Sequence, residues 1–444
     1  MMMNVILILV VVLLATVIIW LIRATDNNNL EQPKLDTEPI KDVANDEPSL
    51  FVQRLPILNN QQKVIGYQLI VNSTVESITT QTGHFNALVA MISHYDFAEL
   101  ASDKKAYLKV SADVLENADI SLFPANETVF MVDVTNTQSF PLEACKRLHQ
   151  QGYKFAVLVK NKATLEHPLV EISDYVVIDD RGDSNHLHEW VAKARGKRLR
   201  IIVSHVHKQA QFERIQTLGV NGYQGYYFSE PETLDNTRIG PQVEQVMQLF
   251  NLVSSQAPAD VIEQAFKVDT VLTFNLLRYI NSAGFGIRNE VSSIKSALLF
   301  LGYEKMARWL AVLMAASDDM KNDAQEAVFE VATIRGRLME LLGDEFSEKE
   351  QDALFMTGMF SLLDTMLGMS LEKAIANLQL PEDAVAALLQ KKGRFYDVLS
   401  LAIACEKSAM SDILPLAEKL GLTLAEVNKK QLLATQWAHS LQAG

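Results

Sequence analysis

The chain has 444 residues, of which 48% are hydrophobic and 21% charged, so we expect two or three folded domains and exclude a largely disordered chain. Its formal net charge of −14 argues against general nucleic-acid binding, because neutralising phosphates requires a surplus of Lys and Arg, and we expect no nucleic-acid partner. The two cysteines, Cys145 and Cys405, match no metal or redox spacing, which favours a reducing compartment such as the cytoplasm.

Residues 1–23 are predicted to form a transmembrane anchor. The stretch 5–22 is apolar apart from Thr16, which is close to the ~20 residues needed to cross a bilayer. A cleaved signal peptide is the alternative, but no positively charged stretch precedes the apolar run and no small-residue cleavage site follows it. Lys and Arg residues follow the span and none precedes it, so we expect a single-pass protein with its soluble domains in the cytoplasm.

Residues 24–48 are predicted to be a flexible acidic linker. This stretch is polar, rich in Asn and acidic residues, and interrupted by Pro33 and Pro39. It has no apolar period that a core could bury.

From 49 to 237, short apolar runs alternate with amphipathic segments. The runs are AYLKV, VFMVDV, KFAVLV, DYVVID and LRIIVS, and the segments between them include LEACKRLHQQG and KQAQFERIQTLG. Repeated units of strand and helix predict a parallel sheet, either a barrel or a doubly wound sheet.

From 238 to 444, helical periods replace the strand-like runs and predict an all-α domain. Thr423 and Glu426 form a capping-box pattern that opens a last helix. Apolar residues at helical spacing are interpreted as core positions. They are Leu272, Leu276, Tyr279, Ile280, Leu298, Leu301, Met306, Leu310 and Met314.

The motifs QGYYFSEP, QRLPILNNQQKVIGYQL and FERIQTLGVNGYQG make the stretch from about 50 to 235 resemble the EAL-domain family. That resemblance implies a TIM-like (β/α) barrel of the kind that hydrolyses cyclic-di-GMP. Hydrolysis in that family uses divalent metal ions held by acidic and amide side chains.

Most of the ligand positions that the resemblance implies carry other residues here. Gln68 stands at the glutamate of the Glu-Ala-Leu signature, Lys109 at an asparagine, and Leu158 and Val159 at a pair of aspartates. Asp133 retains an acidic ligand in place of a glutamate. A cation at one position and alkyl chains at two others oppose a two-metal site.

The later strands show the same loss. Val177 replaces a lysine, Asp179 keeps the following aspartate, and Ser204 and His207 replace two glutamates. Gln224 and Gly225 remain as in active members. We therefore expect vestigial site positions, no catalytic residues, no bound metal and no cofactor.

Two other groups of residues could bind a cation, and the alternative for each is that its side chains are simply solvated. His205 and His207 would point to one face if their strand continues, and His186, His188 and Glu189 lie nearby in sequence, so a replacement zinc site is an alternative. The acidic run 179–183 fits no EF-hand spacing and is interpreted as a solvated turn.

The motifs NLLRYINSAGFG, SSIKSALLFLG, EKMARWLAVL and LFMTGMFSLLDTMLGM make 242–410 resemble the HDOD domain. The shared motif positions are Arg278, Asn281, Ser282, Phe285 and Trp309. The turn after the first motif helix is interpreted as fold-stabilising, with a ligand site as the alternative. All nine histidines lie outside 242–410, so a metal site of the HD hydrolase type is excluded there.

Together, a membrane anchor, an EAL-like barrel and an HDOD domain resemble the bacterial EAL-HDOD (YuxH-type) signalling proteins. The resemblance implies a role near cyclic-di-GMP control at the inner membrane. We expect a non-enzymatic signal-transduction protein that contacts other, unidentified signalling proteins. The alternative is a receptor that binds cyclic-di-GMP without cutting it, and residual phosphodiesterase activity is the least favoured reading.

Overall fold

The computed structural model describes residues 50–73, 81–94, 97–135, 140–180, 184–229, 239–280, 291–316, 324–407 and 410–443. The predicted anchor (1–23) and linker (24–48) lie outside these ranges, so the structure does not test them. Within the described ranges, no helix has both the length and the apolar character needed to span a bilayer.

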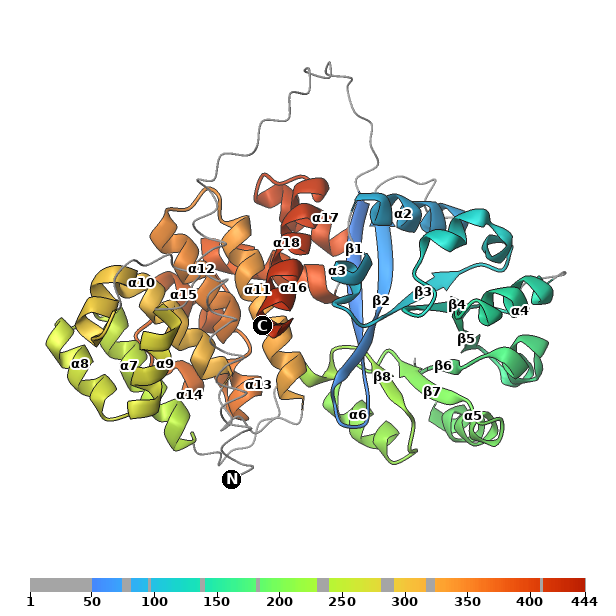
Figure 1. Ribbon diagram of the computed structural model, residues 1–444, viewed down its shortest axis with the longest axis horizontal. Helices are drawn as coiled ribbons and strands as arrows, with labels where there is room; N and C mark the ends of the chain where they lie inside the picture. The colour runs from blue at the N-terminus through green and yellow to red at the C-terminus, as the bar shows by residue number, and fades with distance from the viewer. Residues whose placement is uncertain are drawn as a thin grey trace, which may run out of the picture.

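The first domain is a closed eight-stranded barrel in which the strands follow one another in sequence order (Figure 1). β1 runs antiparallel to both of its neighbours, β2 and β8, and every other neighbouring pair is parallel. The strands are β1 (Leu50–Leu58), β2 (Val64–Ser73), β3 (Lys105–Val110), β4 (Thr128–Val132), β5 (Lys154–Val159), β6 (Tyr175–Asp179), β7 (Arg200–Ser204) and β8 (Gly222–Gln224). The five apolar runs expected to be strands are confirmed as β3 to β7, and the barrel replaces the doubly wound alternative.

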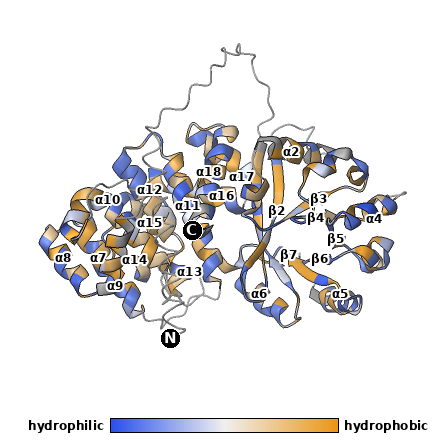
Figure 2. Ribbon diagram, viewed as in Figure 1, coloured by the Kyte–Doolittle hydropathy of each residue, from blue (hydrophilic) through white to orange (hydrophobic). Residues whose placement is uncertain are grey.

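The barrel interior is packed with side chains, as expected for a small barrel. Alternate residues of the strands build an inner cluster that is separate from the main core. Its members are Ile57, Tyr107, Val129, Met131, Ala156, Tyr175, Val177 and Ile202. Figure 2 shows the strands coloured mostly as hydrophobic, whereas helices mix both colours.

Short helices link the strands and cover the outside of the barrel. They are α2 (Gln81–His94), α3 (Phe97–Ala101), α4 (Leu142–Gln150), α5 (Ser184–Gly196) and α6 (Gln209–Gln216). Single 3₁₀ turns add η3 (Asp113–Glu116), η4 (Ala118–Leu122), η5 (Lys162–Glu166), η6 (Pro168–Ile172) and η7 (Tyr227–Ser229).

The second domain is helical, as predicted (Figure 1). Its helices are α7 (Pro241–Ser254), α8 (Ala259–Lys267), α9 (Thr270–Ile280), α10 (Ile294–Ala315), α11 (Gln325–Leu342), α12 (Glu348–Phe360), α13 (Leu363–Leu367), α14 (Leu371–Ile375), α15 (Glu382–Gln390), α16 (Arg394–Lys407), α17 (Met410–Lys419) and α18 (Leu424–Ala443). The predicted core positions are buried, except Tyr279, whose side chain is not described.

One local prediction in this domain, the capping box, is confirmed. The Thr423 hydroxyl accepts from the backbone N–H of Glu426 at 3.3 Å, and Glu426 accepts from the Thr423 backbone N–H at 2.8 Å. Gly302 interrupts α10: its φ of +79° and ψ of 169° are not helical, so two helical segments meet at this residue.

Both cysteines are free and buried. Burial raises the pKa of the Cys145 thiol to about 12 and also raises the pKa of Cys405. Neither thiol is therefore a ready nucleophile or metal ligand at neutral pH.

The two domains meet along β1, where α16 and α18 pack against the strand (Figure 1). β1 pairs with β8 only at Ile57 and Leu58, so the backbone edge before these residues needs other partners. The helical domain supplies them at Val52, whose N–H donates to Asn428 Oδ1 at 2.9 Å and whose carbonyl accepts from Gln431 at 3.4 Å. The barrel edge is thus completed by side chains of α18.

A buried ion pair stabilises the helices that lie against this edge. Arg335 on α11 donates two hydrogen bonds to the Glu406 carboxylate on α16, at 2.8 and 2.7 Å, and both side chains are at least 90% buried. The Glu406 carbonyl in turn accepts from Gln53 of β1 at 3.1 Å. Fork geometry of this kind fixes α11 relative to α16, the helix that packs on β1.

We predict that Arg335→Met lowers the free energy of unfolding by about 3–5 kcal/mol, because it leaves the Glu406 carboxylate buried without its partner. The matched control is Lys419→Met, which removes an exposed ion pair with Asp397 and is expected to cost about 0–1 kcal/mol. Urea unfolding followed by tryptophan fluorescence measures both. Equal losses in the two variants would contradict the structural role of the buried pair.

Candidate functional site

The sequence-predicted site positions gather at one end of the barrel, where the carboxyl ends of the parallel strands β2 to β8 meet. A cavity of about 570 Å³ opens there. Its polar lining comes mainly from Gln68, Lys109, His205, His207 and Gln224. No carboxylate is among the described residues that line it. We call this cavity the barrel mouth.

Two amides close the floor of the barrel mouth. Gln224 Nε2 on β8 donates to Gln68 Oε1 on β2 at 2.5 Å, and both side chains are more than 90% buried. This bond satisfies one donor of the Gln224 amide and the acceptor oxygen of the Gln68 amide. Gln68 therefore occupies the predicted signature position in a neutral, hydrogen-bonded state.

Lys109 is the second-to-last residue of β3, and its side chain is exposed at the barrel mouth. An ammonium group at a position where the EAL-domain resemblance implies a metal ligand repels a divalent cation. The same charge suits an anion.

Asp133 follows β4, and its carboxylate is committed to local partners. Oδ2 lies 2.5 Å from Lys160 Nζ, and Oδ1 accepts from the Thr135 backbone N–H at 3.0 Å and hydroxyl at 2.6 Å. Burial raises the pKa of Asp133, but the hydrogen bonds from Lys160 and Thr135 outweigh it and hold this pKa below its ordinary value. The carboxylate is therefore ionised and already neutralised by a lysine.

The positions aligned with the aspartate pair lie on opposite faces of β5. Leu158 packs against the inner cluster of the barrel, whereas Val159 is buried in the main core outside it. Val177 on β6 also belongs to the inner cluster. None of these side chains has an atom that can ligate a cation.

The histidine pair does not lie as the zinc alternative requires. β7 ends at Ser204, and His205 adopts φ +62°, so the strand does not continue through His207 and the condition set for the zinc alternative is not met, although both side chains line the barrel mouth. His205 Nδ1 lies 2.9 Å from Asp179 Oδ1 and 3.2 Å from the Ser204 hydroxyl. The two imidazole rings are 6.0 Å apart.

The other proposed zinc ligands have local partners elsewhere. On α5, His186 stacks on Trp190, and the Glu189 carboxylate lies 2.5 Å from Lys162 Nζ. Across the described ranges, no three side chains of His, Cys, Asp or Glu come together as a metal site. In the acidic run, Asp180 is ion-paired with Arg214 at 2.5 Å, and 181–183 lie outside the described residues.

The donor set at the barrel mouth does not fit the divalent metals that the resemblance implies. Hard cations need several oxygen ligands, preferably carboxylates. Here the corresponding side chains include an amide, an ammonium group, alkyl chains and two carboxylates, of which Asp133 is paired with Lys160 and Asp179 lies 2.9 Å from His205. We derive no metal-assisted step from this site.

Gly225 is explained by the backbone. It adopts φ +144°, and an added Cβ would lie 2.0 Å from the carbonyl oxygen of Val206. The Gly225 N–H donates to the Pro56 carbonyl of β1 at 3.2 Å. This residue is thus required for closing the barrel, whatever the chemistry of the mouth.

The HDOD motif positions are only partly described. Trp309 on α10 is buried in the helical core. Arg278 lies on α9 with no side chain described, and Asn281, Ser282 and Phe285 lie outside the described residues. The two readings of this turn therefore stay predictions.

Sequence reasoning missed two sets of residues that shape the site. Lys160 lies two residues beyond Leu158, and the period of two along β5 would have placed it on the same face, near Asp133. The second set is Arg54, Tyr67 and Glu330 at the domain interface, for which no local signal exists, because Tyr67 and Glu330 are 263 residues apart.

Comparisons with known proteins agree with the two-domain organisation. The family model for the HDOD domain matches residues 240–392. The chain is similar to the uncharacterized protein YuxH of Bacillus subtilis (strain 168), at 22% identity over 406 residues that cover 88% of this chain and 98% of YuxH. It is also similar to the cyclic di-GMP phosphodiesterase CdgJ of Vibrio cholerae, at 24% identity over 403 residues that cover 88% of this chain and 93% of CdgJ.

Among solved structures, a standalone EAL protein from Vibrio cholerae O395, in a cyclic-di-GMP-bound form, matches 41% of this chain and 92% of its own. The identity is 13% and the TM-score 0.34. The HDOD match and the two curated relatives confirm the predicted pairing of an EAL-like barrel with an HDOD domain.

We predict that Gly225→Ala lowers the free energy of unfolding by at least about 2 kcal/mol, because of both the clash with Val206 and the strained φ. Gly196→Ala is the matched control, since an added Cβ there meets nothing within 4 Å. It is expected to change stability by no more than about 0.5 kcal/mol. Thermal unfolding of both variants tests this, and an unaffected Gly225→Ala protein would refute the steric explanation.

The lowered pKa of Asp133 predicts a pH-dependent contribution to stability. The ionised carboxylate stabilises the fold above its ordinary pKa of about 3.9, and this contribution is lost as the pH falls through the lower pKa of the folded state. The stability difference between the wild type and Asp133→Asn should therefore shrink on acidification. Unfolding curves measured from neutral to acidic pH would contradict the account if the difference stays constant.

Proposed function

We propose that this chain is a non-enzymatic signal-transduction protein that acts through protein–protein contacts in cyclic-di-GMP-linked regulation. The state of the barrel mouth carries the proposal. Its amide pair, its lysine and the Asp133–Lys160 ion pair stand where metal-assisted hydrolysis needs free oxygen ligands. The barrel keeps its fold while its mouth favours hydrogen bonding over metal binding.

The name of CdgJ points the other way, because that relative is a phosphodiesterase. At 24% identity, three positions in four differ, so the ligand residues of one chain need not occur in the other. The proposal therefore rests on the residues of this chain. Leu158 cannot bind a metal and Lys109 repels one, which argues against hydrolysis of cyclic-di-GMP.

The helical domain supports the same proposal. The stretch 242–410 contains no histidine, so it lacks the side chains that bind metal in HD-type hydrolases. Its side chains instead build a packed core and the contact with β1. A domain of this kind acts by presenting a surface to partner proteins.

The apolar stretch 5–22 supports attachment to the inner membrane as part of this function. A single span followed by an acidic linker would concentrate both domains near membrane-bound partners. The signalling proteins that it contacts are part of the proposal without being identified.

A second candidate, a receptor that binds cyclic-di-GMP without cutting it, is favoured by one observation. The barrel mouth has a volume of about 570 Å³, which lies in the range of small-molecule sites. Lys109 and two histidines line it, so its charge suits a phosphate.

Titration of cyclic-di-GMP into the purified full-length chain in detergent, with and without Mg²⁺ or Mn²⁺, separates the two candidates. The protein-contact proposal predicts no saturable binding up to about 100 µM nucleotide. Micromolar binding that needs no metal would overturn it in favour of the receptor. In that case Lys109→Ala should weaken binding at least about tenfold, whereas Lys146→Ala, on the outer helix α4, should not.

A further inference from the structure

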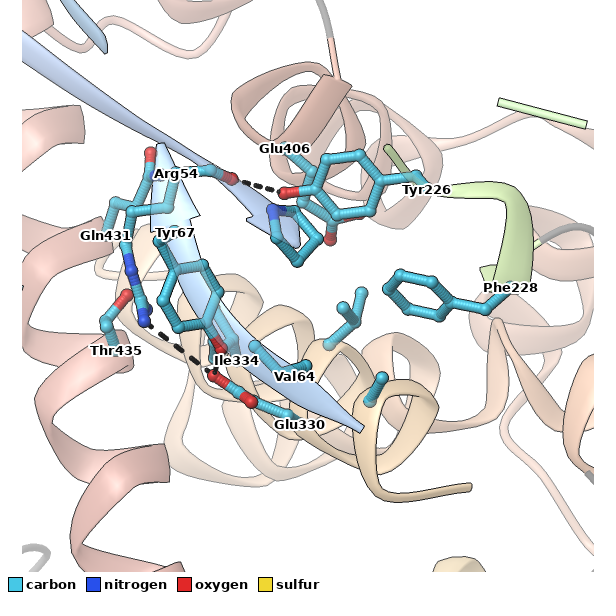
Figure 3. Close-up of a pocket in the computed structure, with 13 residues that line it drawn as sticks. Arg54, Val64, Tyr67, Tyr226, Phe228, Glu330, Ile334, Glu406, Gln431 and Thr435 are labelled. Atoms are coloured by element: carbon cyan, nitrogen blue, oxygen red, sulfur yellow. Dashed lines mark hydrogen bonds and ion pairs between the residues drawn. The ribbon is translucent and has the colours of Figure 1, made fainter. Parts of the chain in front are cut away.

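The barrel mouth and the domain interface lie on opposite faces of the same strand. On β2, Gln68 points into the barrel and bonds Gln224, whereas the neighbouring Tyr67 points outward and its hydroxyl donates to Glu330 of α11 (Figure 3). Neighbouring residues of a strand move together, because a displacement of the backbone at one changes the position of the next. The amide pair is thus one residue away from a contact with the helical domain.

β8 repeats this arrangement at its carboxyl end. Gln224 bonds Gln68 inside the barrel, and two residues later the Tyr226 hydroxyl donates to the Arg54 carbonyl of β1 at 2.7 Å (Figure 3). The two strands that carry the amide pair, or the residues directly after them, therefore both contact the domain interface.

The interface on the outer face is a buried, charged cluster. The Arg54 guanidinium lies 3.9 Å from the centroid of the Tyr67 ring, 3.8 Å from Glu330 and 2.6 Å from the Ser102 hydroxyl. Burial and the nearby Glu330 carboxylate raise the pKa of Tyr67, so its hydroxyl stays protonated and able to donate. Buried charges are satisfied in few geometries, and a small shift of β2 would leave one of them without its partner.

A cavity of about 40 Å³ beside this cluster gives the side chains room to change partners. Residues of both domains line it, among them Arg54, Tyr226, Glu330, Glu406 and Gln431 (Figure 3). Within the described residues, Arg54 Nε and Gln431 Oε1 are buried and have no hydrogen-bond partner. Neither atom is held to one protein partner, which leaves the cluster alternative arrangements close by.

We propose that the Arg54–Tyr67–Glu330 cluster couples the barrel mouth to the helical domain, with β2 as the moving element between them. A change at the Gln68–Gln224 pair shifts β2 and β8, alters the contacts of Glu330 and loosens α11 and α18. The coupling is reciprocal, so a change at Glu330 also loosens β8. This inference goes beyond the proposed function, because it holds for whatever occupies the mouth.

Hydrogen–deuterium exchange on the full-length chain tests the direction from mouth to helices. Gln68→Ala should speed exchange about fivefold in α11 and α18, while peptides of β5 and β6 stay unchanged. Ser204→Ala, at the carboxyl end of β7, is the matched control and should leave α11 and α18 unchanged. No change in these helices, or an equal rise in β5 and β6, would overturn the proposal.

The reverse direction is tested at Glu330. Glu330→Gln should speed exchange in peptides that cover β8, whereas Glu326→Gln, an exposed residue one turn earlier on α11, should not. An effect confined to the helical domain would contradict reciprocal coupling. Neither experiment uses a nucleotide, so its outcome is independent of the binding titration.

Discussion

The structure depends on how the exposed edge of β1 is satisfied. β1 runs antiparallel to both neighbours and pairs with β8 through only two residues, so a barrel on its own would leave polar backbone groups at Val52 without partners. Asn428 and Gln431 of α18 supply those partners, although they lie more than 370 residues away in sequence. The helical domain therefore completes the barrel, which explains why the interface is polar and specific.

The matched positions at the barrel mouth serve the backbone in one case and side-chain hydrogen bonding or ion pairing in the others. Gly225, one position that the EAL-domain resemblance matches, admits no side chain because Val206 approaches closely. The amide of Gln224, the other matched position, bonds Gln68, so the pair forms a neutral floor. The Asp133 carboxylate stays ionised and forms an ion pair with Lys160. The barrel mouth of this chain therefore offers hydrogen-bonding amides and the Lys109 ammonium group rather than free carboxylates.

Local patterns in the sequence predicted the elements well. Short apolar runs predicted β3 to β7, helical spacing predicted the core of α9 and α10, and the Thr423–Glu426 capping box was found where expected. The antiparallel placement of β1 carries no such signal, because direction is set by pairing over long range. The predicted run LRIIVS ends where β7 ends, at Ser204, but the left-handed conformation of His205 that follows it leaves no signal in the sequence. The interface set, Arg54, Tyr67 and Glu330, depends on packing between domains, which no window of sequence contains.

The central functional claim is that the barrel no longer hydrolyses cyclic-di-GMP, and turnover measures it most directly. The purified full-length chain is incubated with cyclic-di-GMP and Mg²⁺ or Mn²⁺, and the linear dinucleotide product is quantified against a protein-free control. The account predicts product at the level of the control with either metal. Metal-dependent product that disappears in Asp133→Asn would contradict it, because it would show that this carboxylate still serves a metal despite Lys160.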